Sequence, residues 1–171
     1  RQELPLSFAQ QRLWFIDQLE PGSHTYNIPA AVRLSGELNV MALEQTLSEI
    51  VRRHEVLRTS FTIANSEPVQ MIAAVAPLPL PVTDLTPMAE AEREAEARRL
   101  AAEEARQPFD LSTGPLFRAQ LLRLSDSEHI LLCTMHHVVS DGWSMGVLIR
   151  EVAALYQAYS CLLYTSPSPR D

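Results

Sequence analysis

The sequence contains no run of about eighteen consecutive apolar residues, so it predicts no membrane-spanning helix. It contains only two cysteines, Cys133 and Cys161, whose spacing matches no metal or redox motif. This scarcity favours a reduced, cytoplasmic compartment. The chain has fewer basic than acidic residues: its 14 Lys and Arg and 21 Asp and Glu give a net charge of -7. That balance disfavours nucleic acid and anionic membranes as partners.

The N-terminus lacks two further features. The segment Arg1–Pro5 has no apolar stretch of the kind found in signal peptides, and the chain does not begin with Met. We therefore expect a fragment of a longer protein. Its 171 residues suffice for one domain with a hydrophobic core. An apolar content of 46%, combined with charges of both signs, is typical of a folded globular protein rather than a disordered one.

The first elements are indicated by a cap and by an alternation. Ser7 and Gln10 have the spacing of a capping box, which predicts a helix from this point to Leu19. Apolar residues recur at every second position over 26–34 and predict a strand. Pro29 within that strand cannot donate to a ladder, so either an edge position or a ladder that starts after Pro29 is expected.

A second helix is predicted after Asn39, whose side chain can serve as its N-cap. Its apolar face is expected to comprise Leu43, Leu47, Ile50, His54 and Leu57. Two strands follow, over 59–63 and 69–75. Four prolines over 77–87 predict an extended connector without regular structure.

The second half begins with a charged helix. Pro87 is expected at its first position, and oppositely charged pairs at helical contact spacing continue over 90–106. This charged surface fits a docking site, but a solvated helix face is the more ordinary interpretation and the one we favour.

Two apolar runs, 116–124 and 129–138, flank a polar turn and predict neighbouring strands. A helix is then expected from near Asp141 to Tyr159. Helices and strands thus interleave, which favours an α/β layered sandwich. The Ser- and Pro-rich end, 160–171, breaks the pattern, and we interpret it as a non-native tail outside the folded domain.

Two adjacent histidines, His136 and His137, end the second of these apolar runs. Neighbouring residues on a strand point to opposite faces, so one imidazole should pack inside while the other faces a cleft. Three interpretations compete. The pair could bind a metal together with Asp141, although adjacent strand side chains diverge. The pair could be ordinary core histidines, or one could be a general base. The residues alone leave the last two equally plausible.

The residues after the histidines suit a turn into a helix. Asp141 stands where an N-cap or an ion pair would be useful, and Gly142 allows close approach of the backbone. Amide groups at the start of a helix can stabilise negative charge.

Three motifs resemble those of one family. His136-His137-Val138-Val139-Ser140-Asp141-Gly142 matches the HHxxxDG signature of condensation domains of nonribosomal peptide synthetases. Residues 7–15 resemble their S-x-A-Q-x-R-L-W motif, and residues 53–61 resemble their R-H-E-x-L-R-T-x-F motif. The resemblance covers about residues 4–159. It implies a chloramphenicol-acetyltransferase-like fold, of which residues 1–159 would form the N-terminal lobe of two.

The resemblance also implies a reaction. Condensation domains form an amide bond between two thioesters, each tethered to a carrier protein by phosphopantetheine. Donor and acceptor peptidyl carrier proteins and an adenylation domain of the same assembly line are therefore the expected partners. No cofactor or metal bound directly by this chain is expected. The segment Tyr26–Pro29 resembles the subtype that joins an L-configured donor to an L-configured acceptor.

Roles for individual residues follow from the same resemblance. His137 would face the cleft, as a general base or as the group that orients the attacking amine, while His136 supports the strand end. Asp141 would be ion-paired, with Arg53 and Arg58 as candidate partners within this chain, or with an arginine of the second lobe. Gly142 is a candidate backbone donor to the oxyanion. Trp143 is expected to pack beneath the following helix.

Three alternatives remain. An acyl-CoA-dependent acyltransferase of the same fold would share the HHxxxDG motif, and so would an epimerisation domain. A single lobe could also act only as a carrier-protein-binding module, because half a tunnel cannot hold both substrates. For that reason we expect the chain alone to be inactive.

Overall fold

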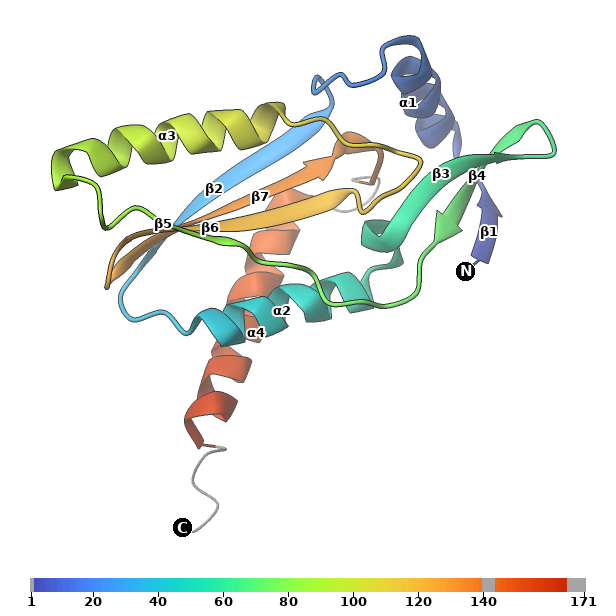
Figure 1. Cartoon of the computed structure of the whole chain (residues 1–171). Helices are drawn as coiled ribbons and strands as arrows, with labels where there is room; N and C mark the ends of the chain where they lie inside the picture. The colour runs from blue at the N-terminus through green and yellow to red at the C-terminus, as the bar shows by residue number, and fades with distance from the viewer. Residues whose placement is uncertain (1, 140–143, 166–171) are drawn as a thin grey trace.

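The computed structural model describes residues 2–139 and 144–165 of the chain. Two sheets lie side by side, and helices cover both faces of the larger one (Figure 1). The larger sheet contains, in spatial order, β2 (Asn27–Ser35), β7 (Glu128–His136), β6 (Phe117–Ser125) and β5 (Val82–Asp84). The smaller sheet contains β1 (Gln2–Pro5), β4 (Glu67–Ile72) and β3 (Thr59–Ala64). The predicted α/β layered class is confirmed.

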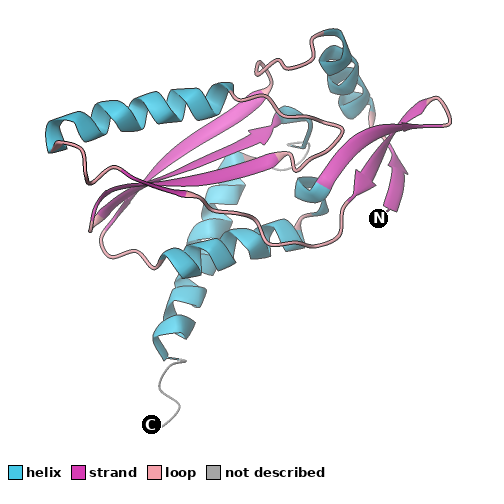
Figure 2. Cartoon of the chain, viewed as in Figure 1, coloured by secondary structure: helices cyan, strands magenta, loops and turns pink. Residues whose placement is uncertain are grey.

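The helices form the outer layers. Figure 2 shows α3 (Glu90–Arg106) on one face of the four-stranded sheet, and α2 (Val40–Arg53) and α4 (Met145–Thr165) on the other. Helix α1 (Phe8–Leu19) lies beside the smaller sheet (Figure 1). Two single turns of 3-10 helix, η1 (Glu55–Arg58) and η2 (His137–Val139), join the regular elements. Among the described residues, no helix is both long and apolar enough to cross a membrane.

Strand β7 divides the core by the parity of its residues. Leu131, Cys133 and Met135 pack in the main hydrophobic cluster together with α2 and α4. Ile130 and Leu132 belong to a smaller cluster beneath α3. Both sets are apolar because helices cover both faces of the strand, and the strand therefore appears in the sequence as a continuous apolar run.

Local capping signals are confirmed where the sequence indicated them. The amide of Gln10 donates to the Ser7 hydroxyl at 3.2 Å, and the amide of Ser7 donates to the Gln10 side chain at 2.9 Å. The side chain of Asn39 accepts from the amide of Ala42 at 3.1 Å. Pro29 lies in β2, which is an edge strand as predicted.

Two predictions around the prolines were wrong. The connector over 77–87 contains β5, since Val82–Asp84 lies between prolines and keeps the amides that a parallel ladder with β6 requires. The following helix begins at Glu90 instead of Pro87. The Asp84 carboxylate accepts from both the amide and the hydroxyl of Thr86, at 3.0 Å and 2.7 Å, and this turn competes with helix formation.

Several boundaries also differ. Helix α2 ends at Arg53, because His54 adopts an extended conformation and caps it, so Leu57 is buried from η1 instead. Strand β1 was not predicted. The strand expected over 69–75 is found at Glu67–Ile72. Helix α4 continues past Tyr159 to Thr165, so the expected end of the helix was wrong. Whether residues 160–171 are native stays untested.

The α2 and α4 layer is joined by polar contacts at both ends. The Tyr156 hydroxyl accepts from the amide of Asn39 at 3.0 Å, at the start of α2. At the other end, His54 Nε2 lies 2.7 Å from a carboxylate oxygen of Glu151. These contacts fix α4 against α2 on that face of the sheet.

We predict that Leu47→Ala lowers the free energy of unfolding by about 2–5 kcal/mol, because Leu47 is fully buried between α2 and the sheet. Met41→Ala, on the same helix at 63% exposure, is the matched control and should change it by less than about 0.5 kcal/mol. Urea denaturation measures both values. Equal losses in the two variants would contradict the assigned face of α2.

Candidate functional site

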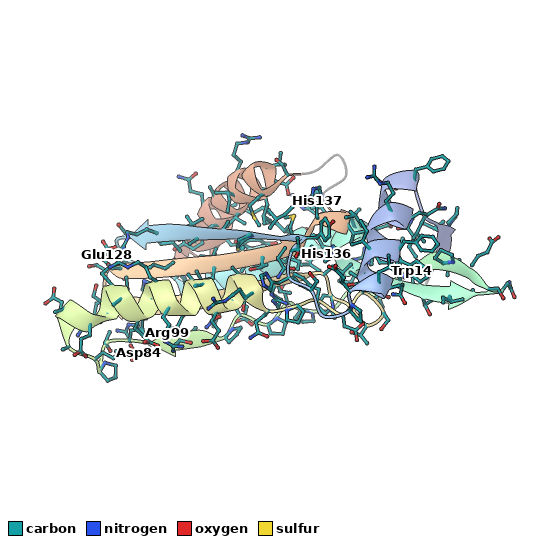
Figure 3. All side chains as sticks on the ribbon, turned by 90° about the horizontal axis from the view of Figure 1, so that it is seen from above. Trp14, Asp84, Arg99, Glu128, His136 and His137 are labelled. Atoms are coloured by element: carbon teal, nitrogen blue, oxygen red, sulfur yellow. The ribbon has the colours of Figure 1, made fainter. Side chains whose placement is uncertain are left out.

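Strand β7 ends at His136, His137 follows directly in η2, and both residues are fixed through the backbone. The amide of His136 donates to the carbonyl of Leu116 at 3.1 Å, on the β6 side. The amide of His137 donates to the carbonyl of Tyr26 at 2.8 Å, on the β2 side. In Figure 3, both histidines lie at the end of β7 nearest to α1 and Trp14. Neighbouring strands therefore hold the two residues from opposite sides.

His136 is an internal residue. Its side chain faces the same side of the sheet as α3, and only 4% of the residue is exposed. Its ring lies 6.1 Å from the ring of Phe109 in an edge-to-face arrangement, and 6.5 Å from that of Tyr26. Its Nδ1 accepts a hydrogen bond of 3.0 Å from the amide of Val138. Nδ1 must therefore carry the lone pair, and the neutral ring carries its proton on Nε2.

Burial lowers the pKa of His136 to about 4, and the neighbouring His137 acts in the same direction. The charged imidazolium would lose hydration and could no longer accept from Val138. The neutral form is thus the one that the fold accommodates near pH 7.

His137 has different surroundings from its neighbour. It begins η2, its side chain is exposed, and the residue after it, Val138, is buried. Helix α1 packs against η2, so the turn that carries His137 is supported from outside the sheet. The difference in burial agrees with the expectation that one histidine packs inside and the other does not. The catalytic role of His137 stays a prediction.

The metal interpretation gains no support from the geometry. The Nδ1 of His136 is already occupied by an amide proton, and Asp141 lies outside the described residues. Within residues 2–139 and 144–165, no group of three or more His, Cys, Asp or Glu side chains could hold a metal ion.

Three predicted residues, Asp141, Gly142 and Trp143, lie outside the described residues. The helix start expected near Asp141 is nevertheless corrected. Helix α4 begins at Met145, and the Ser144 hydroxyl accepts from the amide of Val147 at 3.2 Å, as an N-cap does. The role of Gly142 as a backbone donor stays a prediction.

The two candidate partners of Asp141 have different surroundings. Arg53 pairs with Glu49 on the surface of α2, at 2.9 Å. Arg58 donates to the carbonyls of Val51, Arg52 and Ala73, at 3.1, 3.3 and 2.6 Å. Arg58 thus satisfies the last carbonyls of α2 and joins them to the segment after β4. The pairing of either arginine with Asp141 stays a prediction.

Residues that sequence reasoning missed surround His136 on the α3 side. Asn27, its register partner on β2, donates to the carbonyls of Ala105 and Gln107 at 3.1 and 2.7 Å. Phe109 and Arg118 complete this cluster. The sequence offers no distinct signal for Arg118, because Arg123 is a second arginine within the same strand.

Comparison with known proteins identifies the family. A family model described as "Condensation domain" matches residues 1–162. The chain belongs to the condensation domain family. It is 52% identical over 159 residues to a linear gramicidin synthase protein of Brevibacillus parabrevis, covering 93% of this chain and 2% of the relative. It is 50% identical to phosphinothricin tripeptide synthetase PhsC of Streptomyces viridochromogenes, covering 91% and 14%.

Solved condensation domains show the same fold. The starter condensation domain of rhizomide synthetase RzmA matches with a TM-score of 0.83 and 29% identity, covering 92% of this chain and 38% of that one. Holo-AB3403, a four-domain nonribosomal peptide synthetase, matches with a TM-score of 0.79 at 22% identity, covering 91% and 12%, which shows the fold alone. The expected chloramphenicol-acetyltransferase-like fold is confirmed. The chain spans well under half the length of the proteins it matches.

The buried state of His136 in this condensation domain predicts a pH dependence of stability. Its folded pKa of about 4 lies below the ordinary value of 6.5, so the unfolded chain binds the proton more readily. The neutral His136 therefore contributes to the free energy of unfolding above pH 6.5. This contribution is lost as the pH falls towards 4, and the loss is roughly 3 kcal/mol at most.

His136→Asn keeps an acceptor near the position of Nδ1 but cannot titrate, and it should remove this part of the pH dependence. The free energy of unfolding, measured between about pH 7 and about pH 4.5, gives the slope. The exposed His24→Asn is the control and should keep the slope of the unmodified protein. A slope unchanged by His136→Asn would show that His136 is not the group responsible.

Proposed function

We propose that this chain is the N-terminal lobe of a condensation domain that joins two carrier-bound thioesters through an amide bond. The observation that carries the proposal is the exposed His137, set at the end of a buried strand beside a neutral, internal His136. Membership of the condensation domain family supports it, together with the names of the relatives, which are synthases and synthetases of peptides.

The reaction requires mainly that the acceptor amine and the donor thioester are correctly positioned. The α-amine of the acceptor attacks the thioester carbonyl of the donor, a C–N bond forms, and the C–S bond breaks to release the donor's thiol. The amine must lose a proton on the way. An α-amino group has a pKa of roughly 7.7–8.0, so a useful fraction is already neutral near pH 7. His137 therefore accepts the amine's proton or orients the neutral amine.

Partners and substrates belong to the same proposal. Both thioesters are held on phosphopantetheine arms of donor and acceptor carrier proteins, and tethering raises their effective concentration at the site. An adenylation domain of the same assembly line loads the carriers. The name of one relative, a tripeptide synthetase, supports this setting. A cytoplasmic location completes the proposal.

The remaining candidate residues take supporting roles. Asp141 is ion-paired with Arg58 or Arg53, Gly142 offers its amide to the oxyanion, and Trp143 packs beneath α4. We propose that a second lobe closes the tunnel and that the chain alone is inactive, and the span of 38% of the RzmA starter domain chain supports this.

The subtype that joins an L donor to an L acceptor is part of the proposal through Tyr26–Pro29. In the structure this segment begins β2, and its Asn27 binds the end of α3. Offering the complete domain donors of either configuration, with one L acceptor, tests the subtype. Faster condensation of the D donor would contradict it.

An acyl-CoA donor is the second candidate, favoured by one observation. A variant of the RzmA starter domain is described in complex with C8-CoA, and it matches this chain with a TM-score of 0.71. Free acyl-CoA and an aminoacyl carrier, offered to the complete domain, separate the two functions. Product from acyl-CoA but not from a loaded donor carrier would replace our proposal with this one.

We predict that His137→Ala, in the full-length protein, lowers the rate of amide formation by about 10²–10⁴-fold. The variant should remain folded, because the His137 side chain is exposed. Mass spectrometry of the acceptor carrier measures the product, and circular dichroism checks the fold. The exposed His24→Ala is the control and should condense at the unmodified rate. Near-normal turnover by His137→Ala would remove the assigned role.

A further inference from the structure

The end of α3 meets the sheet beside His136, and one arginine dominates this junction. Arg118, on β6, donates to the carboxylate of Glu104 at 2.7 Å. It also donates to the carbonyls of Glu104, Gln107 and Pro108, at 3.2, 2.9 and 3.2 Å. A single planar guanidinium thus donates to carbonyls at the end of α3 and in the chain that leaves it.

The same guanidinium lies against an aromatic ring. Its central carbon is 3.9 Å from the ring centroid of Phe109, within the range of a cation–π contact. Phe109 is 6% exposed, and the edge-to-face contact with His136 joins it to the imidazole. The chain of contacts therefore runs from Arg118 through Phe109 to His136, without a gap.

A second contact holds the same helix end from the other side. Asn27 binds the carbonyls of Ala105 and Gln107 and lies opposite His136 in the register of β2 and β7. Phe109, two residues beyond Gln107, is therefore fixed in position relative to both strands that flank the imidazole. The cluster joins three elements at the point where the imidazole needs a fixed orientation.

We propose that Arg118 is a positioning residue of the double-histidine turn, acting through Phe109 to hold His136 in the orientation that accepts the amide of Val138. That hydrogen bond shapes the turn His137–Val139, which presents His137. The inference rests on the proposed function, since it assigns Arg118 to the same site. The lowered pKa of His136 agrees with it, because only the neutral ring can accept.

Lysine cannot replace arginine in this role. An ammonium group has three donors on one atom and no planar face, so it cannot reach four oxygens and stack on Phe109 together. Arg118→Lys therefore keeps the charge while removing the stacking contact. The chain offers a matched control in Arg33, which also ties α3 to the sheet but does so through Glu94 and Glu128, far along β7 from His136.

The experiment compares Arg118→Lys and Arg33→Lys in the full-length protein, with both carrier proteins loaded with aminoacyl thioesters. Arg118→Lys should lower kcat by roughly ten- to a hundredfold, with KM for the acceptor carrier changed by less than about twofold. Arg33→Lys should leave both parameters unchanged. Rates are measured at a temperature at which circular dichroism shows each variant to be folded.

Crystal structures of the unmodified protein and of Arg118→Lys provide a readout that does not depend on activity. The ring of Phe109 should be displaced in the variant, and the distance from the Val138 nitrogen to His136 Nδ1 should exceed hydrogen-bond range. Should Arg118→Lys fail to fold, Phe109→Leu removes the same link while leaving the hydrogen bonds of Arg118 to α3 in place, and it should give the same two results.

Different results would refute the proposed function and the positioning role of Arg118. An unmodified protein that forms no amide from loaded carriers refutes the function, and the crystal structures then decide the positioning role. An unchanged kcat in Arg118→Lys overturns the inference, and so does an unmoved pair of Phe109 and His136. An equal loss of kcat in Arg33→Lys also overturns it, because the effect would then be general loosening of α3.

Discussion

The hydrogen bond from the amide of Val138 to Nδ1 of His136 is the interaction on which the geometry of the site depends. It is made inside the protein, where an unmade bond would leave a buried donor without a partner at a cost of about 1–3 kcal/mol. It requires a neutral imidazole in a single tautomer. Because it joins the last residue of a strand to the turn that follows, it determines where His137 emerges.

The rest of the fold provides the conditions for this bond. The apolar run of β7 buries alternate residues against different helices, so His136 necessarily shares a face with Leu132 beneath α3. Met135 faces the larger core instead. Asn27 and Arg118 then hold the end of α3 and Phe109 against the ring. The site is thus a junction between layers, and its precision comes from packing on the side of the sheet away from the exposed imidazole.

Much of the fold could be predicted from the sequence because its signals are local. The capping box at Ser7, the cap at Asn39 and the alternation around Pro29 each depend on residues a few positions apart. Strand β5 was missed because its stability comes from pairing with β6, distant in sequence, and not from its own proline-flanked residues. The start of α3 was misplaced because a side-chain turn at Asp84 outcompeted proline's preference for a first helical position.

The candidate site divides in the same way. Adjacent strand residues point apart, so the sequence could predict that the two imidazoles diverge. Which one is buried could not be predicted, because it depends on the end of β7 at His136, on the start of η2 at His137 and on where α3 lies. The link between Arg118 and Phe109 passes through a loop and a strand, and no periodicity in the sequence indicates it.

The bond from Val138 to His136 can be measured directly. Nitrogen NMR detects scalar coupling between the Val138 amide nitrogen and the acceptor nitrogen of His136 only when a hydrogen bond joins them. At neutral pH we predict that coupling to Nδ1, with the proton of the ring on Nε2. A protonated Nδ1 with no coupling to Val138 would contradict the proposed geometry of the double-histidine turn.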